Sequence, residues 1–190
     1  DYFLVCVLVS LPLIYATRSI AGAIIYFILV VSWAGAEQFA GGVAIPLWGL
    51  LAGMLPLLRR QLQEAAGRNS TLVFLWAFLL TIVVAAGITL EKALPGLWMV
   101  LYSSLFAVMY LHKAKHVPSE GGFWEMPLES CGIVGQSLLI LLLTFKWPWQ
   151  NIGWDYYRTA GYHPLCAAID YVGIIGALAW ALLLLFEAHR

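Results

Sequence analysis

Charged side chains are scarce in this chain. Asp, Glu, Lys and Arg make up only 11% of its 190 residues, against about 25% in soluble globular proteins. Hydrophobic residues make up 63%, and the mean hydropathy is +0.88. Ten basic and ten acidic residues cancel, so no bulk charge favours nucleic acid as a partner. The shortage of charge excludes an ordinary soluble domain and predicts an integral membrane protein.

Cysteine is also rare, and its spacing supports neither a zinc site nor a redox motif. Cys6, Cys131 and Cys166 lie far apart, with no CxxC and no Cys/His pair at ligand spacing. We expect all three to be buried small hydrophobic residues. His112 and His116 have the i, i+4 spacing of two metal ligands, but Pro118 and the following Gly pair predict that no helix continues there. We therefore expect no metal and no cofactor.

Catalytic motifs are missing as well. The sequence contains no Ser/His/Asp set, HExxH, paired-Glu or P-loop pattern, so we expect a protein that is not an enzyme. The opening DYFLVCVLVSLPL has no basic n-region and no small-residue cleavage site, so it does not resemble a signal peptide. We expect the chain to be a fragment that lacks its N-terminal part.

Long apolar runs are what the sequence does contain. A spanning helix needs about 20 residues, so the length allows six or seven spans in a single transmembrane helical domain, residues 1–190. The predicted fold is an all-α bundle of seven spans, or six if the first is incomplete. Ser70 is a predicted N-cap, and Pro46 and Pro56 predict a kinked third span whose freed carbonyls need donors from neighbouring helices. The predicted spans are Tyr2–Ala16, Ile20–Ala36, Ala40–Leu58, Thr71–Leu90, Leu94–Leu111, Ser130–Phe145 and Leu165–Phe186.

The basic residues predict the orientation. One set of alternate connections holds Arg18, Arg59, Arg60, Arg68, Lys113, Lys115 and Arg190. The other set holds Lys92, Lys146 and Arg158. Because cytoplasmic loops are enriched in Lys and Arg, the loop 59–70 is predicted to be cytoplasmic and the loop 146–164 to be outside the inner membrane.

The loop 146–164 is rich in aromatic residues. Such rings rest at the membrane surface with their polar atoms in water, so we interpret them as interfacial anchors. A platform that binds a sugar or a lipid headgroup is the alternative. Trp33 and Trp98 would extend the same belt. The predicted anchors are Trp147, Trp149, Trp154, Tyr156, Tyr157 and Tyr162.

Small residues and arginines predict two kinds of contact. Gly49 and Gly53 form a GxxxG pair, and Gly173 and Ala177 belong to a small-xxx-small row. Both patterns let helix backbones approach closely, and we expect packing within the chain rather than dimerisation. Arg59 and Arg60 are expected to reach lipid headgroups.

A candidate polar site lies in the last span. Asp170 is the one carboxylate well inside a span, and its nearest candidate partners in sequence are Arg158 and His163. Gln136 is a further polar group at membrane depth. A structural ion pair that ties the aromatic loop to the last span is favoured over a proton or cation site, and both interpretations stay open.

Two stretches carry a family resemblance. The segments 11–33 and 124–149 resemble the membrane part of the bacterial "domain of unknown function 2157" proteins, and Met126 stands where that family often has Arg. The family's soluble N-terminal segment is absent. The resemblance implies a bacterial inner-membrane protein and carries over no catalytic residue. The matching positions are Tyr15, Arg18, Ser19, Pro127, Leu128, Gly132, Thr144, Phe145, Lys146 and Trp149.

These features lead to one functional expectation and one alternative. We expect an envelope or accessory membrane protein without catalytic chemistry. The alternative is a small transporter or lipid-handling protein that uses Asp170, because interrupted helices and buried ionisable groups are typical of transport sites. The expected partner is the lipid bilayer, a membrane-protein partner is left open, and nucleic acid is excluded.

Overall fold

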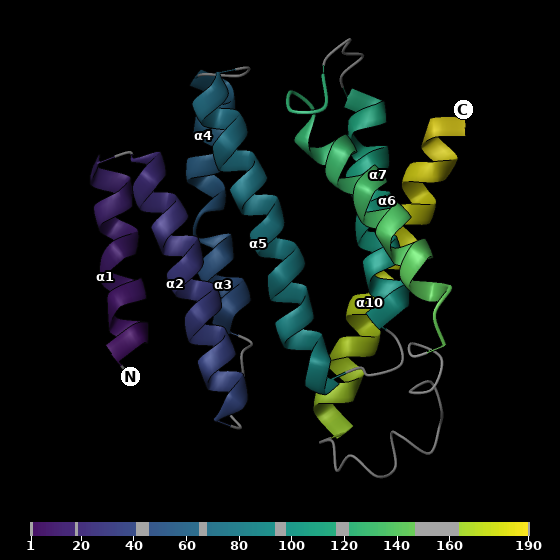
Figure 1. The fold of residues 1–190 in the computed structure, drawn as a ribbon, viewed down its shortest axis with the longest axis horizontal. Coiled ribbons are helices and arrows are strands. Elements are labelled where there is room, and N and C mark those ends of the chain that lie inside the picture. The colour runs from purple at the N-terminus through teal and green to yellow at the C-terminus, as the bar shows by residue number, and fades with distance from the viewer. Residues whose placement is uncertain are drawn as a thin grey trace. The chain divides into compact units, whose positions relative to one another are not determined.

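The computed structural model describes most of the chain. The helices are α1 (Tyr2–Thr17), α2 (Ile20–Phe39), α3 (Pro46–Ala52), α4 (Leu55–Glu64), α5 (Asn69–Ala93), α6 (Trp98–His116), α7 (Pro127–Leu143) and α10 (Pro164–His189) (Figure 1). The predicted all-α class is confirmed for this part of the chain. The described residues are 2–17, 19–40, 46–64, 68–93, 98–116, 122–146 and 164–189, without the side chains at 3, 90–93, 113–116, 164–171, 173 and 188–189.

The chain divides into two compact units. Unit 1 comprises Asp1–Thr89 and unit 2 comprises Leu90–Arg190. In unit 1 the helices alternate in direction, so the α1–α2 turn, the end of α4 and the start of α5 lie at one end of the unit (Figure 1). This alternation brings Arg68, directly before α5, to the end of unit 1 where α4, the helix of Arg59 and Arg60, also ends.

The core of unit 1 is built on one face of α2. Ala23, Phe27, Val30 and Ala34 recur at helical spacing and are buried. The ring of Phe27 lies 5.7 Å, centroid to centroid, from the rings of both Phe74 and Phe78 of α5. Ser19 caps α2, because its Oγ accepts the N–H of Gly22 at 3.2 Å.

Trp33 lies on this same buried face. It is 5% exposed, so the expectation that it belongs to an interfacial aromatic belt is wrong. The reason is its register: it follows Val30 by three residues and therefore faces the bundle.

In unit 2, α6 packs against both α7 and α10. Helix α6 ends at His116, five residues after the predicted span end at Leu111, so both His112 and His116 lie on it. The ring of His112 lies edge-on to that of Trp180 in α10, with 6.5 Å between centroids. Cys131 is buried as expected, whereas Cys6 is exposed on α1, and the side chain of Cys166 lies outside the described residues.

Two helices of the described chain are long and apolar enough to cross a membrane. They are Ile20–Phe39 and Asn69–Thr89, and both begin at the same end of unit 1 (Figure 1). Shorter apolar helices cover Leu4–Thr17, Trp98–His112, Pro127–Leu143 and Ile174–Glu187.

Candidate functional site

The third predicted span is interrupted rather than continuous. Pro46 opens α3, and the chain leaves the helix at Gly53 and Met54 before α4 starts at Leu55. Pro56 has no N–H to donate to the carbonyl four residues earlier, and its ring collides with that carbonyl in a straight helix. The predicted kink is therefore confirmed, and the break precedes Pro56.

The interruption frees backbone carbonyls. The N–H of Met54 donates to the carbonyl of Leu51 at 3.0 Å, as in a 3₁₀ turn, instead of to the carbonyl of Leu50. A carbonyl released in an apolar environment costs several kcal/mol, on the order of a lost hydrogen bond in hydrocarbon, unless another donor reaches it. The neighbouring helices must supply that donor.

Two tyrosines supply the donors. The hydroxyl of Tyr26, from α2, donates to the carbonyl of Leu50 at 3.0 Å. The hydroxyl of Tyr15, from α1, donates to the carbonyl of Gly53. Tyr26 is fully buried, so its phenol is both part of the core and a polar support. The predicted need for help from neighbouring helices is thereby confirmed.

Close packing accompanies these hydrogen bonds at only one of the two predicted glycines. A Cβ added to Gly53 would lie 3.1 Å from Cδ1 of Leu11 in α1, so this glycine lets α1 approach. A Cβ added to Gly49 would meet no described atom within 4 Å. Ala177 is half-buried on α10, and the surroundings of Gly173 lie outside the described residues.

Among the described glycines, the tightest contacts lie at Gly132 and Gly135, a pair that we did not select from the sequence for helix packing. A Cβ on Gly132 of α7 would lie 2.9 Å from the carbonyl oxygen of Phe106 and 3.0 Å from Cβ of Tyr110, both in α6. At Gly135 it would overlap the ring of Phe106. In the sequence this contact corresponds to the two glycines of CGIVG, which are three residues apart, whereas the GxxxG pattern has glycines four residues apart.

A polar pair joins the same two helices. Nε2 of Gln136 in α7 donates to Oγ of Ser103 in α6 at 3.2 Å, and Ser103 is in turn 3.5 Å from Oε1 of Gln136. Thr81 and Ser104 instead donate to carbonyls of their own helices, at 2.6 and 2.9 Å. Each of these polar side chains thus bonds either to a neighbouring helix or to the preceding turn of its own helix.

The two arginines of α4 are both exposed but differ in their partners. Nε of Arg60 lies 2.6 Å from Oε1 of Glu64, one turn later, whereas Arg59 forms no ion pair with any described residue. At the start of α5, the carbonyl of Arg68 accepts the N–H groups of Thr71 and Leu72, so Arg68 rather than Ser70 precedes the helix. The predicted N-cap at Ser70 is wrong, because Ser70 is already inside the first turn.

Several predicted site residues fall outside what the structure describes. The backbone of Asp170 lies within α10, but its side chain is not described. The loop positions outside the described residues are Trp147, Trp149, Trp154, Tyr156, Tyr157, Arg158, Tyr162 and His163. The predicted tie between Asp170 and the aromatic loop therefore stays a prediction.

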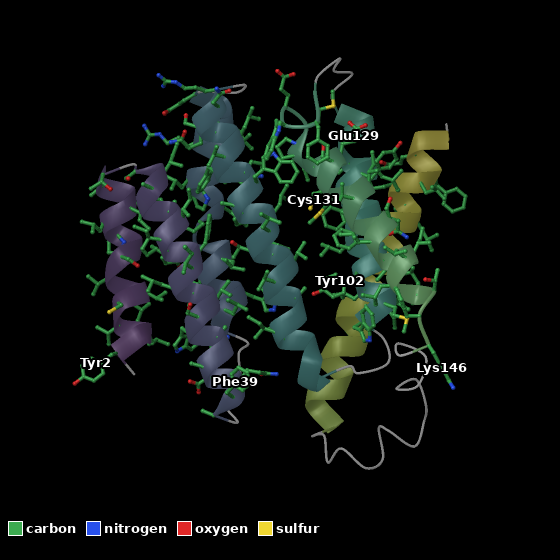
Figure 2. The ribbon with its side chains drawn as sticks, in the orientation of Figure 1. Tyr2, Phe39, Tyr102, Glu129, Cys131 and Lys146 are labelled. Atoms are coloured by element: carbon green, nitrogen blue, oxygen red, sulfur yellow. The ribbon has the colours of Figure 1, made fainter. Side chains whose placement is uncertain are left out.

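Figure 2 shows the described side chains along both units, including the labelled Glu129 in the first turn of α7 and the exposed Lys146 beyond its end. Comparison with family models, curated proteins and solved structures finds no match to this chain.

Proposed function

We propose that this protein is a multi-pass inner-membrane protein with a structural or accessory role in the cell envelope and no catalytic activity of its own. The observation that carries the proposal is the placement of large aliphatic side chains. Val9 and Leu13 of α1 are 63% and 60% exposed, and Ile28 of α2 is 60% exposed. Leu141 of α7 and Leu183 of α10 are exposed to a similar extent. Such faces on successive helices suit lipid rather than water.

The polar groups support the same environment. Tyr15, Tyr26, Ser103 and Gln136 all direct their hydrogen bonds to neighbouring helices, as a chain in hydrocarbon must. A soluble helical protein would instead place polar side chains on the outer faces that aliphatic residues occupy here.

Seven spans are proposed. They are α1, α2, the interrupted pair α3–α4, α5, α6, α7 and α10. Among the described residues, α2 and α5 are long and apolar enough to span by themselves, and the shorter apolar stretches can span where the bilayer thins locally or flanking residues reach the surface. The alternating directions in unit 1 support the placement of Arg59 and Arg68 on one side, which the charge count assigns to the cytoplasm.

Cysteine labelling tests this topology. In a variant with the three native cysteines replaced, Gln63→Cys is expected to react with a membrane-impermeant maleimide only after cells are opened. Asn151→Cys is expected to react in intact cells. Labelling of both residues from the same side, or of Gln63→Cys from outside, would show that the proposed orientation is wrong.

Transport is the second candidate, because an interrupted helix and an acidic residue in α10 are features of transport sites. The freed carbonyls of Leu50 and Gly53 already accept tyrosine hydroxyls, which favours a fixed support over a cation site. The test is thermal unfolding in detergent of Asp170→Asn, Arg158→Gln and the double variant. Strictly additive losses of thermal stability in the double variant would exclude an ion pair between Asp170 and Arg158. A pH-dependent activity that Asp170→Asn leaves intact would exclude the proton-site role.

A further inference from the structure

We propose that α4 is a binding surface for anionic phospholipid headgroups, that Arg59 is its principal contact, and that Arg60 takes no direct part. The inference rests on the proposed membrane location and adds the lipid class and the residue that selects it. Arg59 and Arg60 are adjacent, and the sequence alone predicts the same lipid contact for both.

The faces of α4 separate the two arginines. Leu57 and Leu58 face the bundle and are 5% and 8% exposed. Leu55 and Leu62 remain 46% and 40% exposed. Leu55 precedes Arg59 by four residues and Leu62 follows it by three, so both leucines lie on the same face of the helix as Arg59. An arginine between two exposed leucines suits the boundary where aliphatic side chains meet lipid and a guanidinium meets phosphate.

Arg60 lies about 100° further round the helix, on the face of Glu64. The Arg60–Glu64 ion pair cancels one positive charge, with both side chains about half exposed. Arg59 forms no ion pair with any described residue, so its charge remains for an external anion. Arg60 already has a carboxylate partner, so it has less to gain from a phosphate.

The position of α4 in unit 1 suits a contact between Arg59 and lipid headgroups. This helix lies at the end of unit 1 where α2 and α5 both begin, and these are the two helices that are long and apolar enough to cross a membrane within the described residues (Figure 1). Arg68 is exposed directly before α5 and adds a second positive charge at that end. The ends of spanning helices lie at the level of the headgroups, so both guanidinium groups can reach lipid phosphates.

Lipid titration of the purified protein, followed by native mass spectrometry, tests the proposal. The probes are dioleoylphosphatidylglycerol, which is anionic, and dioleoylphosphatidylcholine, which has no net charge. The unmodified protein is expected to prefer the anionic lipid. Arg59→Gln is expected to weaken that preference about fivefold, the effect of one basic residue near a membrane surface. Arg59→Lys is expected to retain most of it.

The matched control is Arg60→Gln combined with Glu64→Gln, which removes two charges of opposite sign and leaves the net charge unchanged. This variant is expected to keep the preference, whereas Glu64→Gln alone is expected to raise it by releasing Arg60. An equal loss in Arg59→Gln and in the double variant would overturn the proposal. The absence of any preference in the unmodified protein would overturn it as well.

Carbonate extraction of each variant from membranes keeps this result distinct from the proposed function. Extraction of the unmodified protein into the soluble fraction would refute the membrane location itself. Retention in the membrane without lipid preference would refute only the role of Arg59.

Discussion

The phenol of Tyr26 shows how a single side chain can complete the backbone of another helix. Its ring is fully buried in unit 1, and its hydroxyl donates to the carbonyl of Leu50. Replacement by Phe keeps the ring and removes only the donor. A buried acceptor left without a donor costs about 1–3 kcal/mol, more than the net value of a typical hydrogen bond.

We therefore expect Tyr26→Phe to lower the free energy of unfolding by about 1–2 kcal/mol, because the freed carbonyl of Leu50 loses its partner. Unfolding of the purified protein in mixed detergent micelles measures this change. Tyr2→Phe is the control, because the side chain of Tyr2 is 92% exposed and its loss of a hydroxyl should have little effect. Equal stability of the Tyr26→Phe variant and the unmodified protein would contradict the supporting role of this hydroxyl.

Single residues also mark the limit of prediction from the sequence. Pro56 predicts a break, and an apolar environment predicts that the freed carbonyls need donors. The donors themselves lie 24 and 38 residues before their acceptors, at Tyr26 and Tyr15. Nothing local in the sequence selects these two tyrosines, because the choice depends on how α1 and α2 lie against α3.

At the scale of elements, the contact between α6 and α7 depends on the absence of a side chain. At Gly132 the missing Cβ leaves room for the backbone of Phe106 and Tyr110, which cannot move aside as a flexible side chain could. Close backbone approach increases dispersion contact, the main attraction between helices in a lipid environment. It also brings Gln136 within hydrogen-bonding distance of Ser103.

Gly132→Ala is expected to destabilise the protein by about 1–3 kcal/mol, because the added methyl forces the two helices apart. Gly176→Ala in α10 is a matched control, since a Cβ there meets no described atom within 4 Å. The control should be neutral or more stable by up to about 1 kcal/mol, as alanine favours helix over glycine. Chemical unfolding of both variants measures the difference, and similar stabilities would contradict a tight α6–α7 contact.

Helix positions follow from apolar runs more reliably than helix contacts do. The predicted second span, Ile20–Ala36, begins at the residue where α2 begins and ends three residues early. The GxxxG pattern gave one close contact, at Gly53, whereas the tighter site at Gly132 has a different spacing. The bounds of a helix follow from the length of its own apolar run. A contact between helices also depends on how the partner helix is rotated about its axis, which a single sequence does not specify.

For the whole molecule, the division into two units predicts how substitutions combine. Tyr26 belongs to unit 1 and contacts α3, whereas Gly132 belongs to unit 2 and contacts α6. These two sites share no packing partner. Effects at independent sites add to within about 0.5 kcal/mol.

The double variant Tyr26→Phe, Gly132→Ala is therefore expected to lose the sum of the two single losses. The measurement is a double-mutant cycle under one set of detergent conditions. A coupling above about 1 kcal/mol would show that the two sites are not independent and would contradict the expectation.

The hydrogen bonds from Tyr15 and Tyr26 to the interrupted segment α3–α4 also form in an order set by synthesis. During synthesis the N-terminal segments emerge first, so α1 and α2 are made before the interrupted helix that follows them. The hydroxyl donors of Tyr15 and Tyr26 are therefore synthesised before the carbonyls of Leu50 and Gly53 that accept from them. The pair of helices α1 and α2 can therefore bond to the freed carbonyls of Leu50 and Gly53 as soon as these are made.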